Sequence, residues 1–386
     1  MKKINILGVN LIVTNKTEIK NYLRAALFGH KARQIVTPNP EFLLAAQKDK
    51  AFWRILNNAD LAVPDGFGLK CAAWLKGVNL TRFPGADLML EILKLAESQK
   101  ARVAIVNWQN GLSSEQEIKQ VLHLRFSRLN FVIKSLPKKD IADDLVWLKN
   151  FGPKILLVNF GAPEQDKFIA NIKNSLPSLK LAMGVGGSFD FLTKKRARAP
   201  KFFRALGLEW LWRLLIQPSR FKRIFNAVVV FSVQAVAWQW RSFFLRPNAV
   251  AMIITPKKEI LLLNRLGSRD YWGLPQGGID THESAAQAVK REIFEETGLK
   301  NIKILASFKN IFKYHWPSSY TNRGYKGQKQ TLFIVSYNGP LSAVKVSSDE
   351  HKAYKWVPLE QLISASGRVH EDAYRLFLEK LKIVKF

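Results

Sequence analysis

Residues 277–299 read GGIDTHESAAQAVKREIFEETGL, and this stretch decides how the C-terminal part of the chain is interpreted. Most residues from Ala285 to Glu296 are good helix formers. Gly298 follows them at the position where a left-handed residue commonly ends a helix. The stretch therefore predicts a glycine-containing loop that leads into a helix ending at Gly298.

Three glutamates are placed to share one face of this helix. Glu292, Glu295 and Glu296 are spaced i, i+3 and i+4, which brings their carboxylates together. Crowded like charges repel, and a bridging cation would remove that repulsion. Oxygen-only ligands suit Mg²⁺ or Mn²⁺, which also bind substrate phosphates. The alternative interpretation is a solvated acidic face paired with Lys290 and Arg291.

The spacing across residues 277–299 resembles the Nudix box at every fixed position. The neighbouring segments WGLPQGGID (272–280) and GQKQ (327–330) resemble the bacterial RNA pyrophosphohydrolases and dinucleoside-polyphosphate hydrolases of that family. The resemblance covers about residues 246–386 and implies an α/β/α sandwich that hydrolyses a nucleoside diphosphate-linked substrate with Mg²⁺ or Mn²⁺. It implies that Glu292, Glu295, Glu296 and Glu350 bind the metal, that Glu296 and Glu350 are catalytic, and that Gly277, Gly278, Glu283, Arg291 and Gly298 are structural.

The length, cysteine content and net charge limit what the whole chain can be. Its 386 residues are enough for two domains with separate cores. A single cysteine, Cys71, excludes an internal disulfide and fits a reducing cytosol. The opening MKKINILGVNLIV is expected to be a first strand and not a signal peptide. The net charge of +30 favours polyanionic partners: nucleic acid, anionic lipid or diphosphate substrates.

Apolar runs alternate with helical patterns from residue 4 to about 192. This alternation predicts a Rossmann-like α/β domain with a mostly parallel sheet covered by helices. Ligands of such sheets bind at the carboxyl ends of the strands. We expect strands at 5–13, 34–37, 61–63, 102–106, 130–133, 154–159 and 180–185, and helices at 41–56, 86–98, 115–125 and 164–175.

Loops rich in polar and glycine residues follow several of these strands. They are TPNPE (37–41), PDG (64–66), GAPEQD (161–166) and GVGG (184–187). Each alone is an ordinary turn. Together with RAP (198–200) and GLEWLWRL (207–214), they resemble the WecG/TagA/CpsF glycosyltransferase family over about residues 1–225.

This second resemblance implies a reaction and a set of residues. The family transfers an N-acetylhexosamine-type sugar from a UDP donor to a polyprenyl-diphosphate-linked acceptor, inverts the anomeric centre and needs no metal. Such a transfer needs one base for the acceptor hydroxyl. The chain departs from the family at NWQNG (107–111), where a glycine-rich turn is usual, and at SLP (135–137). The implied roles are Asp65 as the base, and Thr37, Asn39, Arg82, Gln165, Arg213, Arg220 and Arg223 as substrate-binding residues.

Basic and aromatic residues are interleaved between positions 194 and 223, with Glu209 as the one acid. This composition suits the surface of an anionic membrane, single-stranded nucleic acid, or a solvated basic helix. The family resemblance favours the membrane. The run FNAVVVFSVQAVAWQWRSFF (225–244) is interrupted by polar residues and is expected to be an interfacial or docking helix, with a buried interdomain helix as the alternative.

The sequence thus predicts a fusion of two enzymes. We expect a glycosyltransferase core at 1–193, a basic aromatic tail with a connecting helix at 194–245, and a Nudix domain at 246–386. The protein would lie in the cytoplasm, peripherally on the inner face of the cell membrane. The alternative hypothesis is a Nudix RNA 5′-pyrophosphohydrolase whose degenerate N-terminal domain binds nucleic acid.

Overall fold

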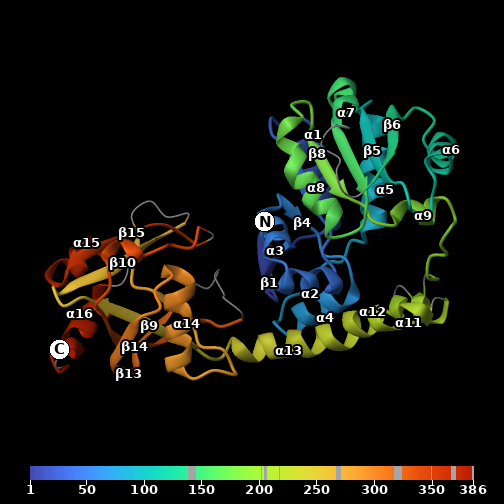
Figure 1. Cartoon of the computed structure of the whole chain (residues 1–386). Helices are drawn as coiled ribbons and strands as arrows, with labels where there is room; N and C mark the ends of the chain where they lie inside the picture. The colour runs from blue at the N-terminus through green and yellow to red at the C-terminus, as the bar shows by residue number, and fades with distance from the viewer. Residues whose placement is uncertain are drawn as a thin grey trace. The chain divides into compact units, whose positions relative to one another are not determined.

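The computed structural model describes the chain except residues 138–144, 201, 204–206, 217, 267–270, 317–323, 349, 367–370 and 385–386. It divides into two compact units, Met1–Gln239 (unit 1) and Trp240–Phe386 (unit 2), which are described separately (Figure 1).

Unit 1 is built on a six-stranded sheet in the order β4-β3-β8-β7-β5-β6. Every recorded pair of neighbouring strands is parallel, which confirms the expected Rossmann-like architecture. The strands are β3 (Arg33–Val36), β4 (Leu61–Ala62), β5 (Val103–Trp108), β6 (Phe131–Leu136), β7 (Ile155–Asn159) and β8 (Leu181–Gly184).

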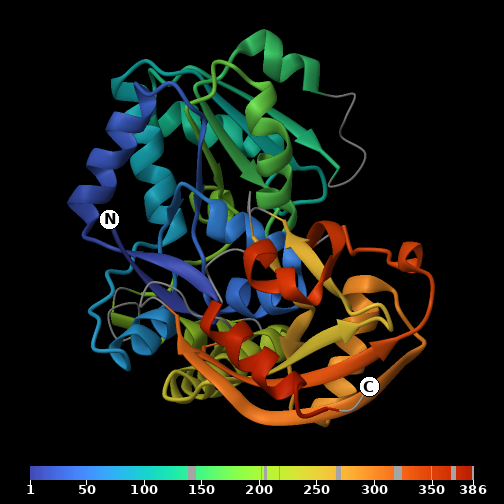
Figure 2. The same ribbon diagram turned by 90° about the vertical axis from the view of Figure 1, so that its left-hand side faces the viewer.

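Helices cover both faces of this sheet (Figure 2). Strands β3 and β8 are neighbours in the sheet, but the helices that follow them, α2 and α9, pack on opposite faces. The buried side chains of α2 and α9 belong to two separate hydrophobic cores. Such a reversal opens a crevice at the carboxyl ends of the two strands. One face carries α1 (Lys16–Leu27), α5 (Gly85–Ser98), α6 (Glu115–Arg125) and α9 (Ser188–Leu192); the other carries α2 (Pro40–Lys48), α3 (Lys50–Asn58), α4 (Phe67–Trp74), α7 (Val146–Phe151) and α8 (Glu164–Ile172).

Two sequence expectations for unit 1 were wrong. The apolar run at 5–13 is an antiparallel hairpin of β1 (Lys2–Ile6) and β2 (Val9–Val13), outside the parallel sheet. The chain reverses at Leu7 and Gly8, both with positive φ, inside what reads as one continuous apolar run. The single helix expected at 41–56 is two, because Asp49 accepts a hydrogen bond from the Phe52 N–H at 2.9 Å and starts α3.

A chain of short helices follows the sheet. It consists of α11 (Glu209–Ile216), η3 (Pro218–Arg220), α12 (Phe221–Phe225), the π-helical turn η4 (Asn226–Val230) and α13 (Phe231–Arg241). Among the described residues, Phe221–Arg241 is the one helical stretch with the length and composition of a membrane span, at 21 residues and a mean hydropathy of 1.2. Yet Phe231, Ala235 and Trp238 pack into the core of unit 1. The helix therefore docks along one stripe and leaves its other faces exposed.

Unit 2 is a mixed sheet between two helical layers, as the α/β/α prediction requires. Its strands run β11-β10-β9-β14-β13, with β12 paired to β9 and β15 to β10. Helix α14 packs on one face, and α15 and α16 pack on the other. The elements are β9 (Arg246–Ile254), β10 (Glu259–Arg265), β11 (Trp272–Gly273), β12 (Gln276–Gly278), α14 (Ala285–Thr297), β13 (Ile302–His315), β14 (Gly327–Tyr337), β15 (His351–Pro358), α15 (Leu362–Ser366) and α16 (Glu371–Leu381).

Candidate active sites

In unit 1, Asp65 lies just beyond the carboxyl end of β4, where two predicted loops meet. Its N–H donates to the Pro38 carbonyl at 2.8 Å, which joins the loop after β4 to the loop after β3. Gly66 has φ +123°, and a Cβ there would lie 2.9 Å from Cδ of Pro40. Only glycine adopts this conformation readily, so Gly66 permits the two loops to touch.

The Asp65 carboxylate sits at the N-terminus of α5. Its Oδ2 accepts a hydrogen bond from the Gly85 N–H at 2.9 Å. The Thr37 hydroxyl also lies close to Gly85. A Cβ placed on Gly85 would be 3.0 Å from Thr37 Oγ1 and 3.4 Å from Asp65 Oδ2. The helix dipole stabilises a carboxylate at this position. The structure thus brings together Thr37 and Asp65 from the ends of neighbouring strands.

Arg82 connects Asp65 to the helices that follow the sheet. Its Nε lies 3.9 Å from Asp65 Oδ1, and its Nη2 pairs with the Glu209 carboxylate at the start of α11. The Arg82 Nε is buried and has no hydrogen-bond partner. A buried, unsatisfied cationic donor beside Asp65 is suited to an anionic ligand.

Two other predicted site residues support the loops themselves. Asn39 caps α2, because its Oδ1 accepts a hydrogen bond from the Phe42 N–H at 3.0 Å. Gln165 is only 2% exposed. Its Oε1 accepts hydrogen bonds from the N–H of Gly161 at 3.1 Å and of Gly186 at 2.8 Å. One amide oxygen therefore ties the GAPEQD loop to the GVGG loop.

The predicted arginines of the tail are only partly described. Arg223 on α12 pairs with Glu41 on α2, with Nη2 and Oε2 2.5 Å apart, and its side chain is 63% exposed. The side chains of Arg213 and Arg220 lie outside the described part of the chain. The pairing with Glu41 joins α12 to the helix that Asn39 caps.

Sequence reasoning missed a buried polar network at the same edge of the sheet. Asn159 Nδ2 donates to Asn107 Oδ1 at 2.6 Å, and Asn107 Nδ2 donates to the Ser113 carbonyl at 3.1 Å. The Ser113 hydroxyl donates to Asp190 Oδ1 at 2.8 Å. The available signal was that the apolar strands VAIVNW and ILLVN each carry an asparagine near the carboxyl end.

In unit 2, the predicted helix is confirmed at both ends. Ser284 and Gln287 form a capping box at the N-terminus of α14, and Gly298 ends the helix with φ +72°. The glutamates of the Nudix box therefore lie on a well-defined helix, as the spacing predicts.

The glutamates of α14 have different environments. Glu296 is 7% exposed, and its Oε2 accepts a hydrogen bond from the Gln276 N–H at 3.0 Å. Burial, followed by the negative charges of Glu292 and Glu350, raises the pKa of Glu296 well above its usual value. Burial also raises the pKa of the Glu292 carboxyl. The Glu295 side chain, by contrast, is 58% exposed.

Arg291 holds the box together. Its guanidinium pairs with Glu283 and Glu292, each at 2.7 Å, and donates to the Gly278 carbonyl at 3.0 Å. Pairing with Arg291 lowers the pKa of Glu283. The Glu292 carboxylate lies against Gly277, where any side chain would overlap it. These contacts give Gly277, Gly278, Glu283 and Arg291 structural positions.

Among the described residues, no three or more His, Cys, Asp or Glu side chains lie together in a group that could hold a metal ion. The donor set nevertheless fits a divalent cation. The half-buried Glu292 and the buried Glu296 both have raised pKa values, and the charges of Glu292 and Glu350 contribute to the raised pKa of Glu296. Oxygen ligands under such repulsion are those that Mg²⁺ or Mn²⁺ stabilises.

Uncharged polar side chains from β12, β13 and β14 form hydrogen bonds with one another, and Gln276 of this group also donates its N–H to the buried Glu296. Gln330 Nε2 donates to Gln276 Oε1 at 3.0 Å, and the Tyr314 hydroxyl donates to Gln328 Oε1 at 2.7 Å. Burial raises the pKa of Tyr271 to about 12, so its hydroxyl stays neutral at neutral pH. The motifs at 272–280 and 327–330 contain the three glutamines, whereas Tyr271 and Tyr314 were not predicted.

Two family models match the chain. The glycosyl transferase WecG/TagA/CpsF family matches residues 4–244, and the NUDIX domain matches residues 245–379.

Curated relatives match the N-terminal part. The N-acetylglucosaminyldiphosphoundecaprenol N-acetyl-beta-D-mannosaminyltransferase of Staphylococcus aureus (strain MRSA252) is 30% identical over 227 residues, covering 58% of this chain and 88% of the relative. The enzyme of the same name from Bacillus subtilis (strain 168) is 29% identical over 232 residues, with the same coverage of both chains.

Solved structures match about a third of the chain. A C. elegans Ap4A hydrolase binary complex has a TM-score of 0.29 and 24% identity, covering 36% of this chain and 98% of that one. The Nudix hydrolase RenU from M. smegmatis has a TM-score of 0.30 and 18% identity, covering 37% and 88%. With its family model spanning 4–244, the chain belongs to the glycosyl transferase WecG/TagA/CpsF family, and it carries a NUDIX domain at 245–379.

Proposed function

We propose that unit 1 transfers an N-acetylhexosamine-type sugar from a UDP donor to a polyprenyl-diphosphate-linked acceptor, with inversion, in the synthesis of a cell-surface polysaccharide. The supporting observation is the position of Asp65 at the N-terminus of α5 beside Thr37 and Arg82. The curated relatives carry names that describe such a transfer onto a diphosphoundecaprenol-linked sugar.

In the proposed reaction, Asp65 is the general base. The acceptor hydroxyl gives its proton to the Asp65 carboxylate as its oxygen bonds to the anomeric carbon. The bond from that carbon to the donor phosphate breaks, and UDP leaves with the electron pair. The Gly85 N–H holds the Asp65 carboxylate at the N-terminus of α5 through its hydrogen bond to Oδ2.

We assign Arg82 to binding the negatively charged phosphate groups of the substrates. Its buried Nε has no hydrogen-bond partner, so a phosphate oxygen would satisfy it. Thr37 and Asn39 are assigned to sugar hydroxyls, and Gln165 to holding the loops around them. Arg213, Arg220 and Arg223 are assigned to the diphosphates as a basic tail.

The tail also supports a peripheral position on the inner face of the cell membrane. Exposed apolar side chains line the helices from Glu209 onward, including Leu215, Phe221 and Val233, each at least 60% exposed. Basic residues alternate with them in the sequence. Apolar side chains with interspersed cations suit the boundary of an anionic bilayer.

For unit 2 we propose hydrolysis of a nucleoside diphosphate-linked substrate with Mg²⁺ or Mn²⁺. Glu292, Glu295, Glu296 and Glu350 would hold the metal, which neutralises the substrate diphosphate and activates a water molecule when bound. The Gln276 N–H orients Glu296, and Arg291 orients Glu292. Either Glu350 or Glu296 would accept a proton from the attacking water.

A substrate panel on the full-length protein tests both halves. UDP-sugars are offered with a short lipid-diphosphate acceptor, and separately nucleoside diphosphate-linked compounds and 5′-triphosphorylated RNA are offered with and without Mg²⁺. We expect sugar transfer without added metal and metal-dependent hydrolysis of the small nucleotides. Release of pyrophosphate from RNA, with no sugar transfer, would instead establish the RNA pyrophosphohydrolase.

A further inference from the structure

Helix α4 has apolar side chains on two faces. Leu69, Ala72 and Ala73 are buried in the core of unit 1. On the opposite side, Cys71 is exposed and the Trp74 side chain is 75% exposed. An indole ring left in water forgoes a large hydrophobic contribution, so this second face is suited to an apolar ligand.

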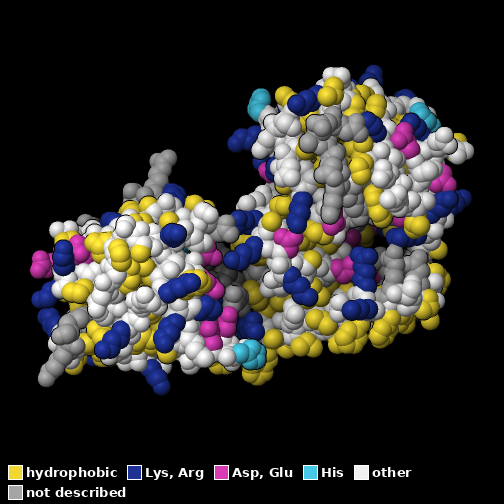
Figure 3. All heavy atoms as spheres, in the orientation of Figure 1, with side chains coloured by type: hydrophobic (Ala, Val, Ile, Leu, Met, Phe, Trp, Pro, Cys, Tyr) yellow, Lys and Arg dark blue, Asp and Glu magenta, His cyan; other side chains and the backbone are white. Residues whose placement is uncertain are grey.

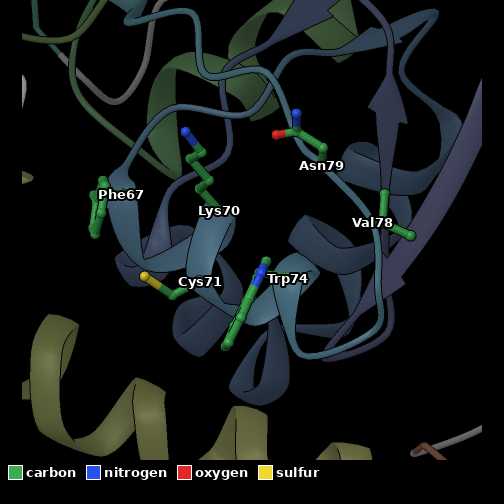
Figure 4. A pocket seen from close by; sticks show the side chains of 6 residues that line it. All are labelled: Phe67, Lys70, Cys71, Trp74, Val78 and Asn79. Carbon is green, nitrogen blue, oxygen red and sulfur yellow. The ribbon is translucent and has the colours of Figure 1, made fainter.

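The exposed face of α4 lines a hollow of about 240 Å³ (Figure 4). The lysine ammonium and the asparagine amide point to one side of it, and Trp74 lies across from them. The surface is therefore apolar within and polar along one edge. Its lining residues are Phe67, Lys70, Cys71, Trp74, Val78 and Asn79.

The first residue that lines this hollow, Phe67, is two positions after the candidate base in the chain. Asp65 and Gly66 directly precede α4, whose eight residues span ~12 Å. Phe67 packs on Gly207, and Gly68 lies against Phe231 of α13. The hollow thus adjoins the helices whose exposed apolar side chains gather along α11–α13 in Figure 3.

We propose that the hollow on α4 binds the first isoprene units of the acceptor's polyprenyl chain, an inference that rests on the proposed transferase function of unit 1. The acceptor carries a reacting hydroxyl, then a diphosphate, then an apolar chain. Matching chemistry follows in the same order along the chain: Asp65 just before α4, then the exposed cation of Lys70 and the apolar Cys71 and Trp74 on α4, and Val78 just after it. This match of charge and polarity favours the prenyl chain over a bilayer acyl chain, which ends in no group that Asp65 would act on.

The single cysteine of the chain gives a direct test of binding. Cys71 in the full-length protein is alkylated with a maleimide in detergent micelles, with undecaprenyl phosphate or with an equal amount of phosphatidylglycerol. We expect undecaprenyl phosphate to slow alkylation about tenfold and phosphatidylglycerol to leave the rate unchanged. No protection, or equal protection by both lipids, overturns the proposal.

Kinetics then test whether the hollow serves the reaction. In Trp74→Ser we expect the KM for a long-chain acceptor to rise about tenfold, as one buried indole is lost, with the KM for a short-alkyl acceptor and for the UDP donor unchanged. Leu124→Ser is the control, because Leu124 on α6 is 80% exposed and lies outside the hollow.

The two proposals fail in different ways. Equal effects of Trp74→Ser on long and short acceptors overturn the prenyl site while sugar transfer stands. If the wild-type protein transfers no sugar to either acceptor, the transferase function fails, and protection of Cys71 alone then decides whether α4 binds a prenyl chain.

Discussion

In unit 1, Asp65 lies near Thr37 from the loop after β3 and near Arg82 and Gly85 from the segment that leads into α5, whereas in unit 2 the three box glutamates lie within two turns of one helix. The first site depends on long-range packing of a sheet and its loops. The second depends mostly on local helical spacing and one arginine. We therefore expect the two sites to be independent in their chemistry and to differ in their sensitivity to changes in the backbone.

The largest expected effect comes from removing the candidate base. Asp65→Asn keeps the size of the side chain but cannot take a proton, so sugar transfer should fall by ~10²–10⁴-fold. Hydrolysis of nucleotides by the same preparation should be unchanged. Loss of both activities in a folded protein would contradict the independence of the sites.

The reciprocal change sharpens the same comparison. Glu296→Gln removes the buried carboxyl group proposed to bind the metal, and we expect hydrolysis to fall by at least ~10²-fold with sugar transfer intact. Excess chelator should have the same selective effect. Glu360→Gln, at an exposed acid of unit 2, is the control. Full hydrolysis in chelator would rule out the metal site.

A backbone change should affect only unit 1. Gly66→Ala combines a strained φ of +123° with an approach of 2.9 Å to Pro40, so we expect the unfolding free energy to fall by roughly 2–4 kcal/mol, with loss of transfer. Gly77→Ala has φ +67° and nothing within 4 Å of its Cβ, so it should cost only ~1 kcal/mol. Equal costs in calorimetry would show that contact between the loops is unimportant.

A buried carboxyl gives unit 1 a pH dependence. Burial raises the pKa of Asp166, which is 1% exposed, to about 7. Between pH 4 and 7 the folded state holds a proton that the unfolded state has released, so this group lowers stability as pH rises. Asp166→Asn should raise the unfolding free energy at pH 8 by roughly 1–4 kcal/mol and have little effect at pH 4.

Asp49 is the control for the pH experiment, because its contribution to stability changes with pH in the opposite direction. Hydrogen bonding to Lys167 lowers the pKa of Asp49, so its contribution to stability is lost as pH falls through that lowered value. Asp49→Asn should therefore reduce stability at neutral pH and not raise it. Calorimetry that gave the same sign for both variants would contradict the assignment for Asp166.

The smallest expected effect concerns the tail. Arg223 is 63% exposed, so Arg223→Gln should change the unfolding free energy by at most ~1 kcal/mol despite the ion pair with Glu41. If Arg223 binds a diphosphate, the KM for the acceptor should still rise severalfold. An unchanged KM would leave the residue with a structural role alone.

The difference between the two regions also explains what the sequence could predict. The helix at 285–297 was predicted from the helix propensity of residues 285–296 and from Gly298 as its C-cap, both of which are local features of the sequence. The parallel sheet followed from the alternation of apolar and helical patterns. The hairpin at the N-terminus was missed because its turn, Leu7-Gly8, lies within an apolar run.

The unpredicted parts of the sites all depend on contacts between distant residues. Asn107 and Asn159 are 52 positions apart and meet only because β5 and β7 are neighbours. The bridge from Gln165 to Gly186 requires β7 and β8 to pair. No local pattern encodes such pairs, although polar residues near the ends of apolar strands mark where to look for them.

The guanidinium of Arg82 stands between Asp65 and Glu209. A displacement of α11 would leave that cation with one carboxylate in place of two, and the positive field at Asp65 would strengthen. The position of α11 thus affects the charge environment of a side chain 144 positions earlier in the chain without any rearrangement of the sheet.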